Sequence, residues 1–221
     1  MSTGLILLII VGILVGFGAA QRVLDRLRLT DRQALFFVLL MLVSGLLPDI
    51  PLGRSIRINI GGALIPLGLC AYLLIKADTA KERIRACVAS ALTGAAIYWL
   101  GKLLPDEPET AFMDFNYLYG LIAGAIAYLF GRSRRGAFVA GILGAVIADV
   151  ISASEVWLAG IRQPLYLGGA GAMDVIVISG LTAVLLAELA GELIERIWRG
   201  RERDEDRVFE NGEFVERSRQ K

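Results

Sequence analysis

The chain has 221 residues, a formal net charge of +1 from 23 Lys and Arg against 22 Asp and Glu, and a hydrophobic content of 56%. Its mean hydropathy of +0.62 is higher than a single soluble core of this size needs. Two Cys without any His argue against a structural zinc site, and scattered basic residues form no nucleic-acid footprint. We therefore expect an all-α protein of the lipid bilayer, with no cofactor and no nucleic-acid partner.

Seven apolar runs predict about seven transmembrane helices, some of them shorter than the roughly 20 residues that a perpendicular span prefers. The runs are 4–20, 34–47, 58–75, 86–104, 117–130, 136–153 and 172–191. Fifteen Lys and Arg residues follow the first, third, fifth and seventh runs, whereas the alternate connections hold four. Because basic residues are retained in the cytoplasm, this asymmetry predicts an outside N-terminus, a cytoplasmic C-terminus and a multi-pass location in the plasma membrane.

The outer part of the third run is poorly suited to a regular helix. It opens with Asn59, Gly61 and Gly62 and contains Pro66. Irregular backbone at membrane depth is tolerated where it is buried in protein or lines a wet cavity. Asn59, Gly62 and Pro66 are therefore candidate substrate-binding residues on the outer side.

Small residues four apart recur within two of the later runs. Gly120 and Gly124 have this spacing in the fifth run, and Gly136, Ala140 and Gly144 have it in the sixth. Such spacing puts small residues on one helix face, where another backbone can approach closely. We expect tight helix packing inside one chain rather than a homodimer.

Two consecutive runs each carry one aspartate, Asp149 in the sixth and Asp174 near the start of the seventh. A carboxylate in a membrane-length apolar run costs about 2.5–3.5 kcal/mol even on a lenient insertion scale, so a functional reason is the default. Asp149 lies fourteen residues beyond Arg135, or about 21 Å up a helix, which places it in the outer third of the bilayer. The seventh helix begins on the outer side, so both aspartates are expected at one level.

The segment between these two runs, residues 154–171, predicts neither a helix nor a simple polar loop. Residues 156–158 and 165–167 are short extended runs separated by Gly160 and Pro164, which indicates a short hairpin between the sixth and seventh helices. Its edge could hold a peptide by strand addition, and Gly168, Gly169 and Gly171 are candidate substrate-binding residues. The alternative is a folded outer loop whose aromatic side chains anchor at the interface.

A charged cytoplasmic tail, residues 196–221, follows the membrane domain of residues 1–195. Residues 208–215 are near-palindromic around Asn211 and Gly212, a pair favoured in tight hairpin turns. The tail therefore predicts one further hairpin.

Three segments, residues 21–37, 58–74 and 168–188, are similar to a family of small prokaryotic membrane proteins known as a domain of unknown function (DUF1614-like). The resemblance covers most of the chain up to about Glu195. It implies a polytopic membrane protein and supplies no activity.

A second resemblance concerns the two aspartate helices. Residues 147–154 resemble the Tyr-Asp helix of intramembrane aspartyl proteases of the presenilin and signal peptide peptidase type, with Ala148 in place of the Tyr. Residues 171–180 resemble the Gly-x-Gly-Asp helix, with Met173 in place of the second Gly. The counterpart of the Pro-Ala-Leu element would be residues 63–66, on an earlier segment than in that family. The resemblance implies Asp149 and Asp174 as a catalytic pair.

Two carboxylates a few ångströms apart cannot both ionise, so such a pair shares one proton and can activate a water against a peptide bond. The best interpretation is a protease-like hydrolase whose partner is a membrane-spanning peptide. Two other interpretations stay open. A proton- or cation-coupled transporter would continue a polar path from Asp174 past Ser179 and Thr182 toward Glu188 and Glu192. In a noncatalytic scaffold, each aspartate would instead be satisfied by backbone amides.

Overall fold

The structure is a computed structural model that describes most of the chain beyond residue 46. The described residues are 36, 39–40, 43, 47–77, 79–103, 115–130, 133–171, 174–205, 207–210 and 213–216. The first predicted span, 4–20, lies outside the described residues, and the second, 34–47, is described only at scattered positions. The described part is mostly helical, as expected.

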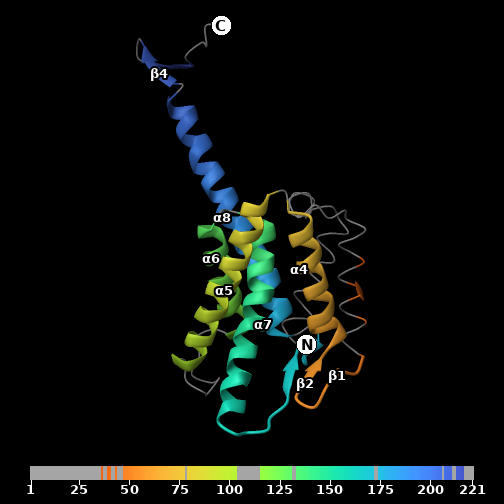
Figure 1. Ribbon diagram of the computed structural model, residues 1–221. Helices are drawn as coiled ribbons and strands as arrows, with labels where there is room; N and C mark the ends of the chain where they lie inside the picture. Colours follow the sequence, from red (N-terminus) through yellow and green to blue (C-terminus); the bar gives the residue numbers. More distant parts are fainter. Residues whose placement is uncertain are drawn as a thin grey trace.

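Five α-helices of the described part form a bundle (Figure 1). They are α4 (Ile65–Ile75), α5 (Ala80–Leu103), α6 (Phe115–Leu129), α7 (Arg134–Leu158) and α8 (Val175–Glu205). The central helix is α7, which packs against the other four. By length and composition, α5 and α7 are each long and apolar enough to cross a membrane.

Small residues bring these helices into contact. A side chain at Gly144 of α7 would meet Thr93 of α5, and side chains at Gly120 and Gly124 of α6 would overlap Thr182 and Leu186 of α8. Where α5, α6, α7 and α8 meet, a buried cluster consists of alanines: Ala89, Ala123, Ala127, Ala137, Ala140, Ala183 and Ala187. The predicted packing of Gly120, Gly124 and Gly144 within one chain is confirmed.

The outward faces of the bundle are apolar as well. The exposed large apolar side chains on the helices include Ile75, Ile84, Val88, Leu92, Trp99, Leu103, Leu121, Leu129, Leu185, Leu189 and Leu193. Water disfavours so much apolar surface, whereas the interior of a bilayer accepts it. The surface therefore agrees with the composition in favouring association with a membrane.

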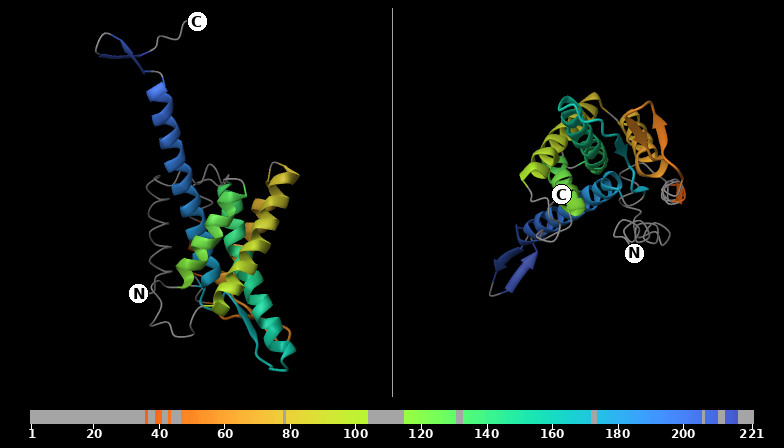
Figure 2. Two further views of the ribbon diagram at one scale, coloured as in Figure 1. Left: turned by 90° about the vertical axis from the view of Figure 1, so that its left-hand side faces the viewer. Right: turned by 90° about the horizontal axis from the view of Figure 1, so that it is seen from below.

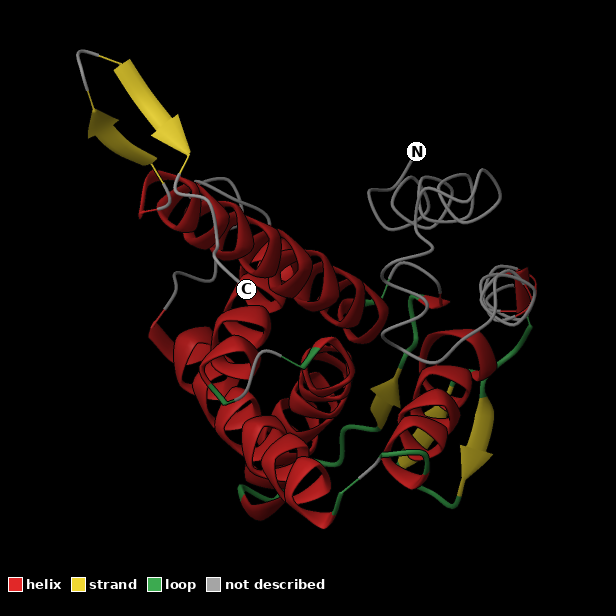
Figure 3. Cartoon of the chain, turned by 90° about the horizontal axis from the view of Figure 1, so that it is seen from above, coloured by secondary structure: helices red, strands yellow, loops and turns green. Residues whose placement is uncertain are grey.

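A three-stranded sheet lies at one end of the bundle (Figure 1). It consists of β1 (Ile50–Leu52), β2 (Ile56–Ile58) and β3 (Leu165–Leu167) in that order. The β1–β2 pair is antiparallel and the β2–β3 pair is parallel. Seen from above, this sheet and the C-terminal hairpin lie on opposite sides of the molecule (Figure 3). Within the three-stranded sheet, β2 and β3 are neighbours although they lie more than 100 residues apart in the sequence.

The predicted hairpin between the sixth and seventh helices is wrong. Residues 156–158 form the last turn of α7, and β3 pairs with β2, in the register Ile56↔Leu165, rather than with a neighbour in sequence. In that last turn, the indole N–H of Trp157 donates to the carbonyl of Gln163 at 2.7 Å, so the following loop folds back on the end of the helix. β3 then pairs with the edge strand β2 of the β1–β2 hairpin.

The irregular start of the third run is confirmed. After β2 the chain forms a π-helix, η1 (Ile60–Leu64), before it continues as α4. π-helical turns are rare and occur often beside functional sites. In this protein η1 packs against the N-terminal end of α8.

The C-terminal hairpin is also confirmed. It consists of β4 (Arg207–Glu210) and β5 (Glu213–Glu216), which pair in the register Val208↔Val215. It sits on the end of α8, which continues without interruption across the expected boundary at residue 195 and projects beyond the other helices (Figures 1 and 2).

Candidate functional site

Asp149 lies on α7 near the end of the bundle that carries the three-stranded sheet. Its side chain has no hydrogen-bond or ion-pair partner in the part of the chain that the structure describes. Asp149 and Ser152 line two cavities, one on each side of α7. A half-buried carboxylate beside two cavities is free to meet water or a ligand, unlike one enclosed in a core.

The first cavity, called the β3-side cavity, has a volume of about 230 Å³. One wall is a face of α7, and the opposite wall is the chain that leads into and forms β3. The lining residues are Asp149, Ser152, Ala153, Val156, Gln163, Pro164, Leu165 and Tyr166. A carboxylate therefore faces an extended strand across a space of this size.

The second cavity, called the α5-side cavity, has a volume of about 260 Å³ and reaches the first residue of α8. Its lining residues are Ile97, Tyr98, Gly101, Lys102, Tyr119, Ala145, Ala148, Asp149, Ser152, Glu155 and Val175. At the rim, Glu155 accepts hydrogen bonds from Tyr98 Oη at 2.8 Å and from Lys102 Nζ at 2.7 Å. This exposed cluster joins α5 to α7 at the mouth of the cavity.

Asp174 immediately precedes α8 and caps its N-terminus. Its Oδ1 accepts from the Ile176 N–H at 3.0 Å, and its Oδ2 accepts from the Ala170 N–H at 3.2 Å. Both bonds use backbone amides, as the scaffold interpretation expects for an aspartate at a helix start. Asp149 accepts no such bond from the residues that the structure describes, so the two carboxylates differ in the described part of the chain.

The structure brings the two aspartates to the same end of the α7–α8 pair. Asp149 and Val175, the residue that follows Asp174, both line the α5-side cavity.

The candidate substrate-binding residues contact other parts of the chain, and none of the six lines the two cavities beside Asp149. The buried Asn59 carboxamide accepts from the N–H groups of Gly61 and Gly62 and donates to Leu47 O at 3.3 Å and to Asp49 Oδ1 at 2.9 Å. It thereby ties the start of η1 to the chain before β1.

Gly62 lies where η1 crosses the turn that precedes α8. A Cβ atom there would overlap the carbonyl oxygens of Gly168 and Gly171. Gly168 and Gly171 have φ of +70° and +62°, a backbone region that favours glycine, and the Gly171 N–H donates to Gly168 O at 2.8 Å. These glycines thus fix the turn that positions Asp174, whereas Gly169 is exposed and Pro66 is buried in α4.

The part of the α7–α8 contact that lies away from the aspartates contains no continuous polar path among the described side chains. Ser179 is fully buried and donates to Gly141 O at 2.9 Å, and the backbones of α7 and α8 touch at Gly141 and Gly180. Glu188 forms an ion pair with Arg134 rather than facing an open channel. The side chain of Glu192 lies outside the described residues. This tight, dry packing argues against the transporter interpretation.

Several residues around Asp149 were not expected from the sequence. Ser152, Tyr98, Lys102 and Glu155 line the cavities, and so does the stretch from Gln163 to Tyr166. Ser152 could have been predicted, because it follows Asp149 by three residues and therefore lies on the same face of the helix. The described residues contain no group of three or more His, Cys, Asp or Glu side chains that could hold a metal ion.

Comparison with known proteins places the chain in a family. Residues 21–186 match the family described as "Protein of unknown function (DUF1614)", and the chain belongs to that family. No curated protein and no solved structure matches the chain. The comparisons thus give no support to the resemblance of the aspartate helices to presenilin-type proteases.

Proposed function

We propose that this protein is a multi-pass protein of the plasma membrane that hydrolyses membrane-spanning peptides, with Asp149 and Asp174 as the catalytic pair. One observation carries the proposal: Asp149, whose carboxylate has no partner among the described residues, faces the strand β3 across a cavity, and β3 precedes Asp174 by seven residues. Support for the membrane setting comes from the apolar outer surface and from the lengths of α5 and α7.

Peptide hydrolysis in a membrane requires the substrate helix to unwind locally, because the N–H and C=O groups of its peptide bonds are hydrogen-bonded within the helix. An edge strand supplies one, since an extended peptide can replace its helical bonds by bonds to the edge. In the β2–β3 ladder, Leu165 N–H donates to Ser55 O at 2.8 Å and Leu167 O accepts from Asn59 N–H at 2.9 Å. Alternate residues of a strand bond to the same neighbour, so the N–H of Tyr166 is directed to the free edge.

The proposed reaction is an ordinary amide hydrolysis. The ionised aspartate takes a proton from a water, whose oxygen attacks the peptide carbonyl carbon. The protonated aspartate donates its proton to the leaving nitrogen as the C–N bond breaks, and the products are one carboxylate and one amine. We assign neither role to one aspartate, because coupled carboxyl groups titrate as a pair.

The test is cleavage of a panel of single-span peptides by purified protein in lipid vesicles, beside Asp149→Asn and Asp174→Asn. Asn is nearly as good a helix cap as Asp, so Asp174→Asn keeps the cap bond from the Ile176 N–H while removing the acid and the weaker bond from the Ala170 N–H. Both variants should lose at least 100-fold in kcat, which is the scale of a general acid–base contribution.

The matched control is Glu155→Gln, which changes a carboxylate on the same helix and at the rim of the α5-side cavity. It should retain cleavage within a few-fold. A peptide with a hydroxyl group in place of the scissile amide should inhibit the parent protein, since it resembles the tetrahedral intermediate. Cleavage that survives either Asp→Asn change would refute the proposed pair.

A further inference from the structure

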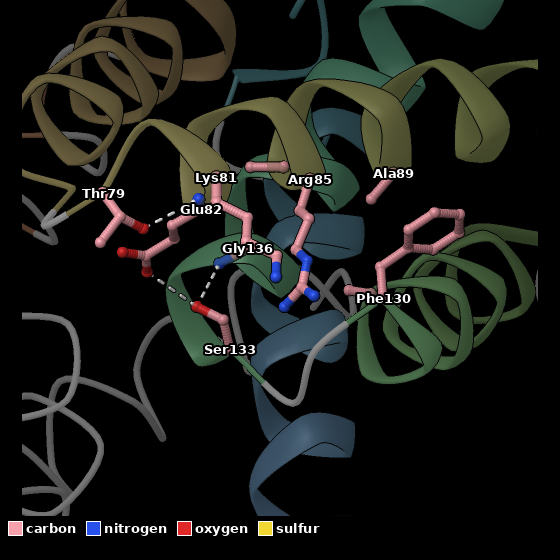
Figure 4. Close-up of a pocket in the computed structure, with 10 residues that line it drawn as sticks. Thr79, Lys81, Glu82, Arg85, Ala89, Phe130, Ser133 and Gly136 are labelled. Carbon is pink, nitrogen blue, oxygen red and sulfur yellow. Dashed lines mark hydrogen bonds between the residues drawn. The ribbon is translucent and has the colours of Figure 1, made fainter.

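A third cavity, called the inner cavity, lies at the opposite end of the bundle from the aspartates. Its volume is about 250 Å³, and it is bounded by the start of α5, the end of α6 and the start of α7. The lining residues are Thr79, Lys81, Glu82, Arg85, Ala86, Ala89, Ala127, Phe130, Ser133 and Gly136 (Figure 4). Polar residues occupy its mouth, and alanines with one aromatic ring occupy its depth.

The mouth carries positive charge that the described part of the chain does not neutralise. Lys81 and Arg85 are one helical turn apart on α5, both extend into the cavity, and neither has a hydrogen-bond or ion-pair partner among the described residues (Figure 4). The one acidic lining residue, Glu82, is already engaged, because it accepts from Ser133 Oγ at 3.2 Å and pairs with Arg135 at 3.5 Å.

Two helix starts add to this charge. Thr79 caps α5 by accepting from the Glu82 N–H at 3.2 Å, and Ser133 caps α7 by accepting from the Gly136 N–H at 3.2 Å (Figure 4). The partial positive charge of each helix start therefore falls at the same cavity as Lys81 and Arg85.

The depth of the cavity is suited to hydrocarbon. Ala86, Ala89 and Ala127 are buried, and Phe130 closes the side next to α6. Just outside it, the exposed faces of α5 and α6 carry Val88 and Leu129, so an apolar surface continues from the cavity along the bundle. A ligand with an anionic head and an apolar chain matches both parts.

We infer that the inner cavity binds one anionic phospholipid, with its phosphate between Lys81 and Arg85 and its acyl chains along the apolar surface of α5 and α6 that continues from the cavity. Basic pockets between membrane helices on the cytoplasmic side bind such head groups. The inference uses the proposed orientation of the chain, but neither Asp149 nor Asp174. It therefore stands or falls independently of peptide hydrolysis.

The test is native mass spectrometry of the purified full chain in neutral detergent, with phosphatidylglycerol, phosphatidylcholine and glycerol 3-phosphate as probes. One phosphatidylglycerol should bind per chain, in preference to phosphatidylcholine. The double change Lys81→Gln with Arg85→Gln should weaken this binding about thirty-fold, which corresponds to about five-fold for each charge.

The matched control is Arg54→Gln with Arg83→Gln, which removes two exposed charges that do not line the cavity. It should leave the affinity within about two-fold, and both double variants should melt at the temperature of the parent in phosphatidylcholine. A photoactivatable phosphatidylglycerol should label the peptide that contains Phe130.

Three results would overturn the inference. The first is equal binding of the two lipids, and the second is an affinity that the Lys81 and Arg85 changes leave intact. The third is glycerol 3-phosphate binding as tightly as phosphatidylglycerol, which would identify a site for soluble phosphate compounds in place of a lipid.

Discussion

Gly62 is the residue on which the position of Asp174 most depends. At this point η1 crosses the turn from Gly168 to Gly171 with backbone against backbone, and no side chain fits between them. Close approach of this kind admits glycine alone, because any Cβ forces the two segments apart.

Gly62→Ala should therefore lower the free energy of unfolding by about 1–3 kcal/mol, the usual cost of overpacking. The rate of peptide cleavage should fall even under conditions in which the variant is fully folded, because the turn that precedes Asp174 moves. Thermal unfolding and cleavage in vesicles measure the two effects. Gly68→Ala is the control, since nothing lies within 4 Å of a Cβ there. An unchanged melting temperature in Gly62→Ala would contradict the crossing.

Individual residues were only partly predictable. Asp149 and Asp174 stand out because a carboxylate in an apolar run is costly, and they do come to one end of the bundle. Asn59 and the glycines stand out as irregular, but their irregularity serves the packing of η1 against the turn before α8. The pattern of residues in a sequence can indicate that a segment has irregular backbone. It does not indicate which other segment packs against it.

At the level of elements, β3 joins the candidate site to the rest of the sheet. Its ladder bonds to β2 involve Leu165 and Leu167, which leaves the amide of Tyr166 for an added strand. The guanidinium carbon of Arg57 lies 5.5 Å from the centroid of the Tyr166 ring, so the ring contacts β2 whereas the amide is directed away from it.

Tyr166→Pro should abolish cleavage while the protein remains folded, because proline removes the outward amide and keeps extended backbone. Tyr166→Ala should keep most of the activity, since it removes the ring and leaves the amide. Cleavage in vesicles, with circular dichroism as the check on folding, compares the two. Equal activity in both variants would exclude strand addition at this edge.

Helices could be predicted from the sequence more readily than strands. The apolar runs locate five of the eight ends of α5, α6, α7 and α8 to within three residues, because a long apolar run favours a helix in a bilayer. The other three ends extend beyond the runs, at the start of α5 and at the ends of α7 and α8, because helices continue into polar sequence outside an apolar run. The partner of β3 could not be predicted, since three-residue strands carry no registry signal and β2 precedes β3 by more than 100 residues. Local turn chemistry did predict β4 and β5, which are neighbours in sequence.

At the level of the whole molecule, the proposed orientation places the three-stranded sheet outside and the inner cavity in the cytoplasm. In a background with Cys70→Ala and Cys87→Ala, Ser55→Cys should react with a membrane-impermeant maleimide in intact cells. Arg83→Cys should react only after the cells are permeabilised. Both positions are exposed, so burial does not limit either reaction. The reverse pattern would invert the topology, and with it the leaflet of the lipid site.

The uninterrupted length of α8 has a mechanical consequence. Its 31 residues span about 46 Å, with Asp174 at one end and the β4–β5 hairpin at the other. A continuous helix behaves as a stiff rod over this distance, so a twist or pull on the hairpin reaches the aspartate as a rigid displacement. A force applied to the hairpin would therefore displace the end of α8 that Asp174 precedes.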